Sequence, residues 1–374
     1  MTVLFLSHEN DKVMGSTLSL ADMIDSLMGA GVKCIVVLPG DGPAKDLFES
    51  KGIRCITARY HVDFVPLGHC AKRVLTFLLR LVRDIVHTKL AIRKICGTLA
   101  DEKIDIVHTN TSVIDFGQDL ARKLGAKHVW HLREMLRPYG FNAFRGNSRL
   151  RCLIANSDAT ISITKAVADY YRVPLSEKNQ VIFDAVRSRS SLLPAMTKEN
   201  RFVFCGLLSE IKHPDDAIKA FVSFSEDYPD YCLDVLGQAN EPEYLDYLKN
   251  LVPGHIAGRV IFHGYVSNPD EYMARAKALL MCSHNEALGR VSIEAMFNLC
   301  PVVAYAGGGS LELIRDNITG FFYTSQEGIT EKIEMIVSDV EKAEVVAADA
   351  RNFALQNFLI EDYSEKIRGV YSRL

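Results

Sequence analysis

Two glutamates separated by seven residues, Glu286 and Glu294, are the residues whose types and spacing most clearly indicate chemistry. They lie in SHNEALGRVSIEAMFNLCPVVAYAGGGSLELI, residues 283–314, directly after the apolar strand-like run ALLMCS. Gly289 permits a tight turn, and a helical pattern begins near Arg290. We therefore expect Glu286 in a loop at the end of a strand and Glu294 about one turn inside the following helix.

The start of that helix is the first predicted ligand site. The first amide groups of a helix have no carbonyl partner, and together with the helix dipole they form a site for an anion such as a diphosphate. Carboxylates only accept hydrogen bonds, so two of them beside a phosphate site suit vicinal ribose or sugar hydroxyls. In the second glycine-rich turn, Gly307–Gly309, we expect Gly308 to let backbone amides approach the ligand.

The full string E-x-x-G-R-x-x-x-E-A-M, followed by NLCPVVAYAGGGSLELI, resembles the retaining GT-B glycosyltransferases of family 4, the glycosyl transferases group 1. The resemblance implies two Rossmann-like domains facing each other across a cleft, with a nucleotide-sugar donor bound between them. It also implies that Glu294 holds the nucleotide ribose, that Glu286 contacts the donor sugar, and that Gly289 and Arg290 belong to the donor site.

A second segment, FCGLLSEIKHPDDAIKAF at 204–221, departs from the pattern of the same family. The family usually has G-R-x-x-x-x-K-G, with the arginine and lysine binding the diphosphate. This chain keeps Lys212 but has Leu207 at the arginine position and His213 at the second glycine. We therefore expect Lys212, the helix amides and Arg290 to hold the diphosphate.

The first half of the chain also resembles the family. Gly15 lies in the loop that usually approaches the donor diphosphate, and the segment HVWHLREML places His131 where a histidine overhangs the donor sugar. His131 and Glu286 are thus the expected catalytic residues. Strand ends and the loops after them supply the expected acceptor-side residues: His108, Asn110, Arg133 and Glu134.

Short β-branched runs alternate with helical patterns along the whole chain, which predicts βαβ units and doubly wound parallel sheets. Five runs fall in each half: 2–7, 33–38, 104–109, 127–132 and 159–164, then 201–206, 231–237, 259–264, 277–283 and 301–306. The polar stretch 184–200 is interpreted as an interdomain linker. The expected domains are an acceptor domain, 1–187 with a C-terminal helix at about 358–374, and a donor domain, 188–357.

Composition narrows the class of protein further. The 374 residues suit two domains, and a net charge of −3 argues against a nucleic-acid partner. No run is apolar enough to span a membrane and no signal peptide is visible, so a cytoplasmic location is expected. There is no D-x-D pair, no zinc spacing and no phosphate-binding P-loop, so we expect neither a metal nor another cofactor.

Residues 71–95, AKRVLTFLLRLVRDIVHTKLAIRKI, form a basic stretch in an otherwise acidic chain. Seven lysines and arginines stand against Asp84 alone, and apolar residues recur at helical spacing. A helix of this kind either packs on the core with a solvated basic face or lies on an anionic membrane. We expect peripheral contact with the membrane, since many relatives extend lipid-linked glycans.

The function expected from these observations is transfer of a sugar from a nucleotide sugar to a glycan or lipid-linked acceptor, with retention of configuration and without a metal. The resemblance implies a front-face displacement in which the donor diphosphate helps to deprotonate the acceptor. Cell-surface polysaccharide or glycolipid synthesis is the expected setting. Two alternatives stay open. One is a sugar-nucleotide epimerase on the same fold. The other is a binding subunit without catalysis, which is considered because Leu207 replaces the usual diphosphate-binding arginine.

Overall fold

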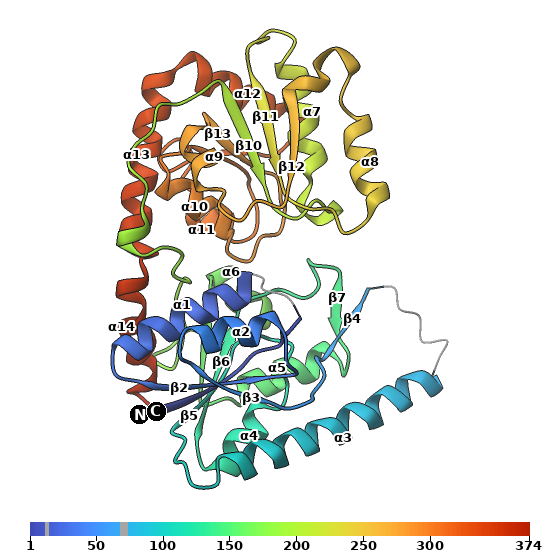
Figure 1. Cartoon of the computed structure of the whole chain (residues 1–374), viewed down its shortest axis with the longest axis vertical. Helices are drawn as coiled ribbons and strands as arrows, with labels where there is room; N and C mark the ends of the chain where they lie inside the picture. The colour runs from blue at the N-terminus through green and yellow to red at the C-terminus, as the bar shows by residue number, and fades with distance from the viewer. Residues whose placement is uncertain (12–14, 68–73) are drawn as a thin grey trace. The chain divides into compact units, whose positions relative to one another are not determined.

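The computed structural model describes residues 1–11, 15–67 and 74–374. The chain divides into two compact units (Figure 1): Met1–Ala185 with Ile360–Leu374, and Val186–Leu359. The boundaries expected from the sequence lie within two residues of these divisions. The stretch 184–200 is not a solvated linker throughout, because Asp184, Ala185 and Val186 are buried.

The first unit is built on a seven-stranded parallel sheet in the order β3-β2-β1-β5-β6-β8-β9. The order reverses at β1, as in doubly wound folds. A separate antiparallel pair joins β4 to β7. The strands are β1 (Thr2–Leu6), β2 (Lys33–Leu38), β3 (Arg54–Thr57), β4 (Phe64–Pro66), β5 (Ile106–Thr109), β6 (Lys127–Leu132), β7 (Phe141–Ala143), β8 (Ala159–Ser162) and β9 (Asn179–Val181).

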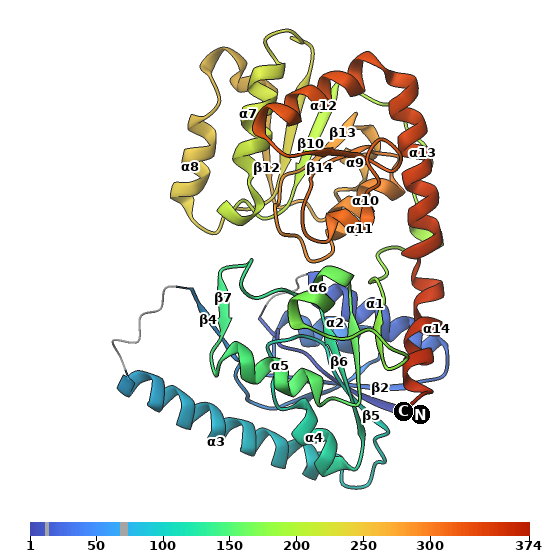
Figure 2. The same cartoon turned by 180° about the vertical axis from the view of Figure 1, so that it is seen from behind.

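Helices cover both faces of this sheet, because alternate residues of its strands point to opposite sides. Val3 and Phe5 of β1 enter a core with α1 and α14, whereas Leu4 and Leu6 enter another with α3 and α4. Figures 1 and 2 show the two sets of helices on opposite sides. The helices are α1 (Gly15–Gly29), α2 (Pro43–Ser50), α3 (Val74–Thr98), α4 (Gly117–Leu124), α5 (Asn147–Ala155), α6 (Lys165–Tyr171) and α14 (Ile360–Tyr371).

The second unit has a six-stranded parallel sheet in the order β12-β11-β10-β13-β14-β15. Its strands are β10 (Arg201–Cys205), β11 (Cys232–Leu236), β12 (Val260–Gly264), β13 (Ala278–Met281), β14 (Val302–Tyr305) and β15 (Phe321–Tyr323). Its α-helices are α7 (Pro214–Phe224), α8 (Pro242–Asn250), α9 (Asp270–Arg275), α10 (Arg290–Phe297), α11 (Ser310–Leu313), α12 (Gln326–Ser338) and α13 (Val340–Asn357). Three 3₁₀ turns complete it: η1 (Arg189–Ser191), η2 (Glu210–Lys212) and η3 (Gly254–Arg259).

All ten strands expected from the sequence are present, and the doubly wound arrangement is confirmed. The strands that the sequence did not predict are β3, β4, β7, β9 and β15, which have three or four residues each. So few residues carry little periodicity of their own, and these strands depend on pairing with a neighbour.

Candidate active site

The turn between β13 and α10 has the conformation that the sequence predicted. Gly289 adopts a left-handed conformation with φ 80°, which favours glycine, and α10 begins at the next residue. Glu286 precedes the helix, and Glu294 lies just over one turn inside it. Both residues are nearly buried, with 6% and 9% exposure. Two carboxylates at this depth require partners.

Glu286 forms an ion pair with Lys212, whose ammonium contacts the Oε1 atom of the carboxylate. Lys212 lies in the short 3₁₀ turn η2, just before α7. The two segments are far apart in the sequence but meet at the carboxyl end of the sheet, where β10 and β13 are neighbours. The expected diphosphate cation and the expected sugar-binding carboxylate are therefore in direct contact.

Glu294 is held by two arginines of the same unit. Its Oε1 atom lies 3.3 Å from Nη1 of Arg187 and 3.4 Å from Nε of Arg290. Arg187 also donates to Asp270, with Nη2 at 2.9 Å from Oδ1. The sequence did not identify Arg187 and Asp270, because Arg187 lies in the stretch interpreted as a linker and neither residue belongs to a recognised motif.

Close contacts with a neighbouring loop explain the glycine run after β14. A Cβ atom on Gly308 would lie 2.5 Å from the carbonyl oxygen of Glu286, and one on Gly309 would lie 2.3 Å from that of Ala287. The amide of Gly309 also donates to the Glu286 carbonyl at 2.7 Å. These glycines thus let the run pack against the loop that carries Glu286. Contact between Gly308 and a ligand remains a prediction.

The two departures from the family pattern have visible consequences. His213 adopts a left-handed conformation with φ 50° and ψ 47°, which explains why glycine usually occupies this position. Leu207 is partly exposed and adds no charge. Of the two cations in the family pattern, this segment therefore keeps Lys212 alone.

A pocket of about 630 Å³ lies at the carboxyl ends of β11 and β12. Doubly wound sheets bind ligands at this edge. The pocket is formed by Leu208, Gly237, Gln238, Ala239, Asn240, Pro242, Leu245, Lys249, Phe262, His263 and Gly264. The sequence did not predict it, because no motif marks the loops that form it.

In the first unit, three of the four expected acceptor-side residues lie in one buried cluster together with His131. His108 Nε2 is 3.2 Å from His131 Nδ1, and Arg133 Nε donates to Asn110 Oδ1 at 2.9 Å. The guanidinium of Arg133 also pairs with Asp184. The sheet brings these side chains together because β5 and β6 are adjacent and end at the same edge.

His131 lies within β6 and has no exposed surface. Among the described residues its Nε2 atom has no hydrogen-bond partner, although Asp184 Oδ1 is 3.8 Å away. Burial and the nearby Arg133 hold the pKa values of His108 and His131 well below their usual range. Both rings are therefore neutral at pH 7, and contact between His131 and a donor sugar remains a prediction.

Two further residues expected in the site occupy different surroundings. Glu134 accepts hydrogen bonds from the amide and the hydroxyl of Ser112, at 2.8 and 2.9 Å, and so orders the loop after β5. Gly15 begins α1, and a Cβ atom there would meet nothing within 4 Å. Packing therefore gives no reason for glycine at position 15.

The basic stretch 71–95 is largely the long helix α3, and its residues 71–73 lie outside the described part of the chain. The helix buries Ala91, Ile92 and Ile95 against the sheet. Its opposite side carries exposed apolar side chains at helical spacing: Leu79, Val82, Val86 and Leu90. None of the described helices combines the length and the apolar character that a membrane span needs.

Comparison with known proteins identifies the family. Residues 191–353 match the family "Glycosyl transferases group 1", and residues 15–182 match "Glycosyl transferase 4-like domain". The two matches together cover most of both units. With its two Rossmann-like units, the chain therefore belongs to the glycosyl transferases group 1 and is a glycosyltransferase of the GT-B type.

Individual relatives are distant. A poly(glycerol-phosphate) alpha-glucosyltransferase of Bacillus subtilis is 26% identical over 60% of this chain, but the match spans only 34% of that enzyme. An N-acetyl-alpha-D-glucosaminyl L-malate synthase of Bacillus anthracis is 23% identical over 77% of this chain and 74% of its own length. The crystal structure of Anabaena HepE in complex with UDP and glucose has a TM-score of 0.79 and 22% identity, with both chains fully covered.

Proposed function

We propose that this protein transfers a sugar from a nucleotide-sugar donor to an acceptor hydroxyl, with retention of configuration. The observation that carries the proposal is the pair of nearly buried carboxylates, Glu286 and Glu294, at the start of α10, each held by a cation. Such a site offers positive charge for a diphosphate and acceptor oxygens for hydroxyls on either side of it.

The donor occupies the carboxyl edge of the sheet in the second unit. Its diphosphate lies at the amino end of α10 and contacts Lys212, and Glu294 accepts hydrogen bonds from the ribose hydroxyls. The nucleobase enters the pocket beside Gly237 and Gly264. The adjacent carboxyl ends of β11, β10 and β13 support this arrangement, because one extended ligand can follow them.

Donor binding exchanges the partner of Lys212. In the empty site the ammonium neutralises Glu286. When a diphosphate arrives, the ammonium moves to the phosphate oxygens. The carboxylate of Glu286 is then left to accept hydrogen bonds from the hydroxyls of the donor sugar. After the exchange the ammonium is paired with a phosphate, and the nearly buried carboxylate keeps hydrogen-bond partners, as its burial requires.

The transfer itself needs no protein nucleophile. The bond between the sugar C1 and the diphosphate oxygen breaks while the acceptor oxygen bonds to C1 on the same face, and the acceptor proton passes to the leaving diphosphate. The "alpha" in the names of both Bacillus relatives supports retention, since common nucleotide-sugar donors are themselves α-linked. His131 and the acceptor-side cluster remain proposed contacts in the first unit.

A cell-surface polymer or a lipid-linked glycan is the proposed acceptor. The relative that acts on poly(glycerol phosphate) supports the first, and the exposed side of α3 supports contact with a membrane. We propose that this side lies on an anionic lipid surface, because exposed cations such as Arg83, Lys89 and Arg93 accompany its apolar residues. A cytoplasmic, membrane-peripheral enzyme is the corresponding cellular proposal.

The function is tested by incubating the protein with a panel of nucleotide sugars and polyol-phosphate or lipid-linked acceptors. A glycosylated product whose anomeric configuration matches the donor is expected. An isomerised nucleotide sugar without acceptor would indicate an epimerase instead. Tight nucleotide binding with no turnover on any acceptor would favour a binding subunit without catalysis.

Dependence on a metal is tested in the same assay. We propose that Lys212 and the amides of α10 take the place of a divalent ion at the diphosphate. Activity should therefore persist after the protein and the donor have been treated with excess chelator. Loss of turnover on chelation, with recovery on addition of magnesium or manganese, would show that this replacement is wrong.

A further inference from the structure

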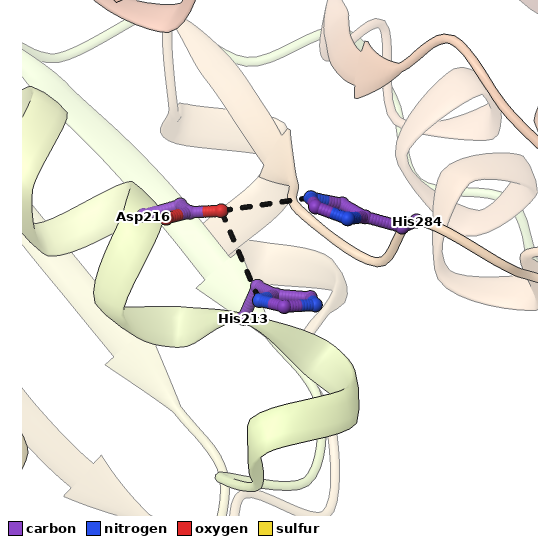
Figure 3. Close-up of side chains that lie close together, drawn as sticks. All are labelled: His213, Asp216 and His284. Carbon is purple, nitrogen blue, oxygen red and sulfur yellow. Dashed lines mark ion pairs between the residues drawn. The ribbon is translucent and has the colours of Figure 1, made fainter. Parts of the chain in front are cut away.

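A second cluster lies beside the proposed donor contacts. His213 at the start of α7, Asp216 in its first turn and His284 in the loop after β13 come together on the second unit (Figure 3). Among the described residues this is the one group of three or more histidine, cysteine or acidic side chains with metal-ligand spacing. No step of the proposed transfer uses it.

The three side chains converge on one point. Asp216 Oδ2 lies 3.9 Å from His213 Nδ1 and 3.7 Å from His284 Nε2, and the three ligand atoms are all within 4.8 Å of one another. Figure 3 shows the two rings approaching the same carboxylate oxygen from different segments. Bonds of about 2.0–2.1 Å place the ligand atoms of a tetrahedral zinc ion about 3.4 Å apart, so the ligand atoms here would have to move closer together around a bound ion.

We infer that His213, Asp216 and His284 bind a divalent transition-metal ion of the zinc class, with a fourth position open to water. Two imidazoles and one carboxylate are the donor set that zinc accepts. Calcium and magnesium prefer oxygen ligands and are poorly served by this set. The inference concerns a site separate from the transfer step and goes beyond the proposed function.

The arrangement of the rings indicates how the site closes. His284 is stacked between His213, at 4.1 Å between ring centroids, and Tyr305, at 3.9 Å. A bound ion lies in the plane of each ligand ring, so two stacked imidazoles cannot both face it. His213 is the outer member of the stack, whereas His284 is held between two rings. It is therefore the ring that turns towards the ion.

The backbone at His213 is consistent with a role for its imidazole. The residue holds a left-handed conformation that glycine adopts without strain. A histidine at this position is therefore unfavourable for the backbone, and a ligand contact by its side chain would offset that effect.

A bound ion would join the same two segments as the Lys212–Glu286 pair. Lys212 directly precedes His213, and Glu286 is two residues after His284. The ion would fix the start of α7 against the loop between β13 and α10. Those segments would then stay together even when the ammonium leaves Glu286 for a diphosphate.

The test is calorimetric titration of the chelator-stripped full chain with zinc chloride, without nucleotide. One ion per chain is expected, and cobalt should give visible d–d bands without a thiolate charge-transfer band. His284→Gln, Asp216→Asn and His213→Asn should each weaken binding by at least about 10–100-fold, the range produced by loss of outer-shell partners alone. Asparagine at 213 tolerates the left-handed backbone.

Two matched controls test for zinc binding at exposed residues outside the cluster. His255→Gln removes an exposed histidine outside the cluster, and Cys152→Ser removes an exposed thiol, so neither should change the affinity. Zinc binding that is equally tight in His284→Gln, or no binding by the wild-type chain, would overturn the inference. Donor binding is measured separately in chelator, so failure of the metal site leaves the proposed function untouched, and the reverse also holds.

Discussion

Glu294 is held in place by charge as well as by packing, because Arg187 and Arg290 both approach its Oε1 atom. We predict that Glu294→Ala weakens binding of the nucleotide-sugar donor by roughly 1–3 kcal/mol, the cost of leaving polar partners unsatisfied. Calorimetry with nucleotide diphosphates measures this loss. Glu331→Ala, at an exposed glutamate of α12, is the matched control and should not change the affinity for nucleotide diphosphates. Unchanged nucleotide affinity in Glu294→Ala would remove the residue from the site.

The Lys212–Glu286 pair allows two substitutions to be compared. Lys212→Ala removes the cation of the diphosphate site and should weaken nucleotide diphosphate binding by about 1.5–3 kcal/mol, the value of a hydrogen bond to a charged group. Glu286→Gln should leave that binding equal or tighter, because the ammonium no longer has a competing carboxylate, while turnover falls. Affinity and turnover are measured on both variants. A parallel loss of diphosphate affinity in the two variants would contradict the proposed exchange of partners.

The helix α3 combines two kinds of cation, which the structure separates. Arg80 donates to the carbonyl of Phe64 at 2.9 Å, and its guanidinium lies 4.1 Å from the ring centroid of Phe144. It is therefore part of the fold of the first unit. Lys89 and Arg93 are exposed beside apolar residues that include Leu79 and Val82, which are 62% and 60% exposed. Arg83 is also exposed, but its Nη2 atom pairs with Oδ1 of the neighbouring Asp84 at 2.9 Å. The membrane test should therefore leave Arg80 intact.

We predict that the protein sediments with anionic vesicles and that salt weakens this binding. Replacing Arg83, Lys89 and Arg93 with glutamine should weaken it by up to about 3 kcal/mol, at about 1 kcal/mol for each cation near the surface. The same exchange at Lys103, Arg122 and Lys165, exposed cations elsewhere in the unit, alters the net charge equally and should have a much smaller effect. No sedimentation of the wild-type chain at low salt would make α3 an ordinary domain surface.

Across the whole molecule, buried neutral histidines make stability depend on pH. Burial lowers the pKa of His128 to about 4, and it also lowers the pKa values of His108 and His131. In the unfolded chain these rings bind protons below about pH 6.5, whereas the folded protein excludes them. The free energy of unfolding should therefore fall as pH drops from 6.5 towards 4. His128 alone accounts for about 3 kcal/mol, at 1.36 kcal/mol for each unit of pKa.

The single tryptophan makes this measurable for the first unit by itself. Trp130 is buried in β6, with its ring centroid 5.5 Å from that of His128. Urea unfolding, followed by the fluorescence of Trp130 at several pH values, shows how the free energy of unfolding changes with pH. In the folded protein the imidazole of His128 bonds to the hydroxyl of Thr109 at 2.8 Å, and the amide of glutamine in His128→Gln can replace this bond. The variant should be less stable at pH 7.5, but its free energy of unfolding should depend less on pH below 6.5. An unchanged dependence on pH would assign the acid sensitivity to other groups.

The sequence by itself determined the elements and the main motif. Runs such as 33–38 and 127–132 are long enough to show their apolar pattern, so the ten strands and the doubly wound class followed from local periodicity. The turn at Gly289 and the helix after it were predictable because a left-handed residue and a helix start are local properties. The short strand β15 was not, since it depends on pairing with β14.

Only the tertiary structure decided which side chains meet. The pairing of Lys212 with Glu286 depends on β10 and β13 being neighbours, and sheet order is not written in either segment. Arg187 reaches Glu294 from a stretch without any motif. The convergence of His213 and His284 on Asp216 arises in the same way, because strands distant in the sequence end at one edge of the sheet. Residue types and local spacing are properties of the chain, whereas contacts between distant segments arise only when the sheet forms.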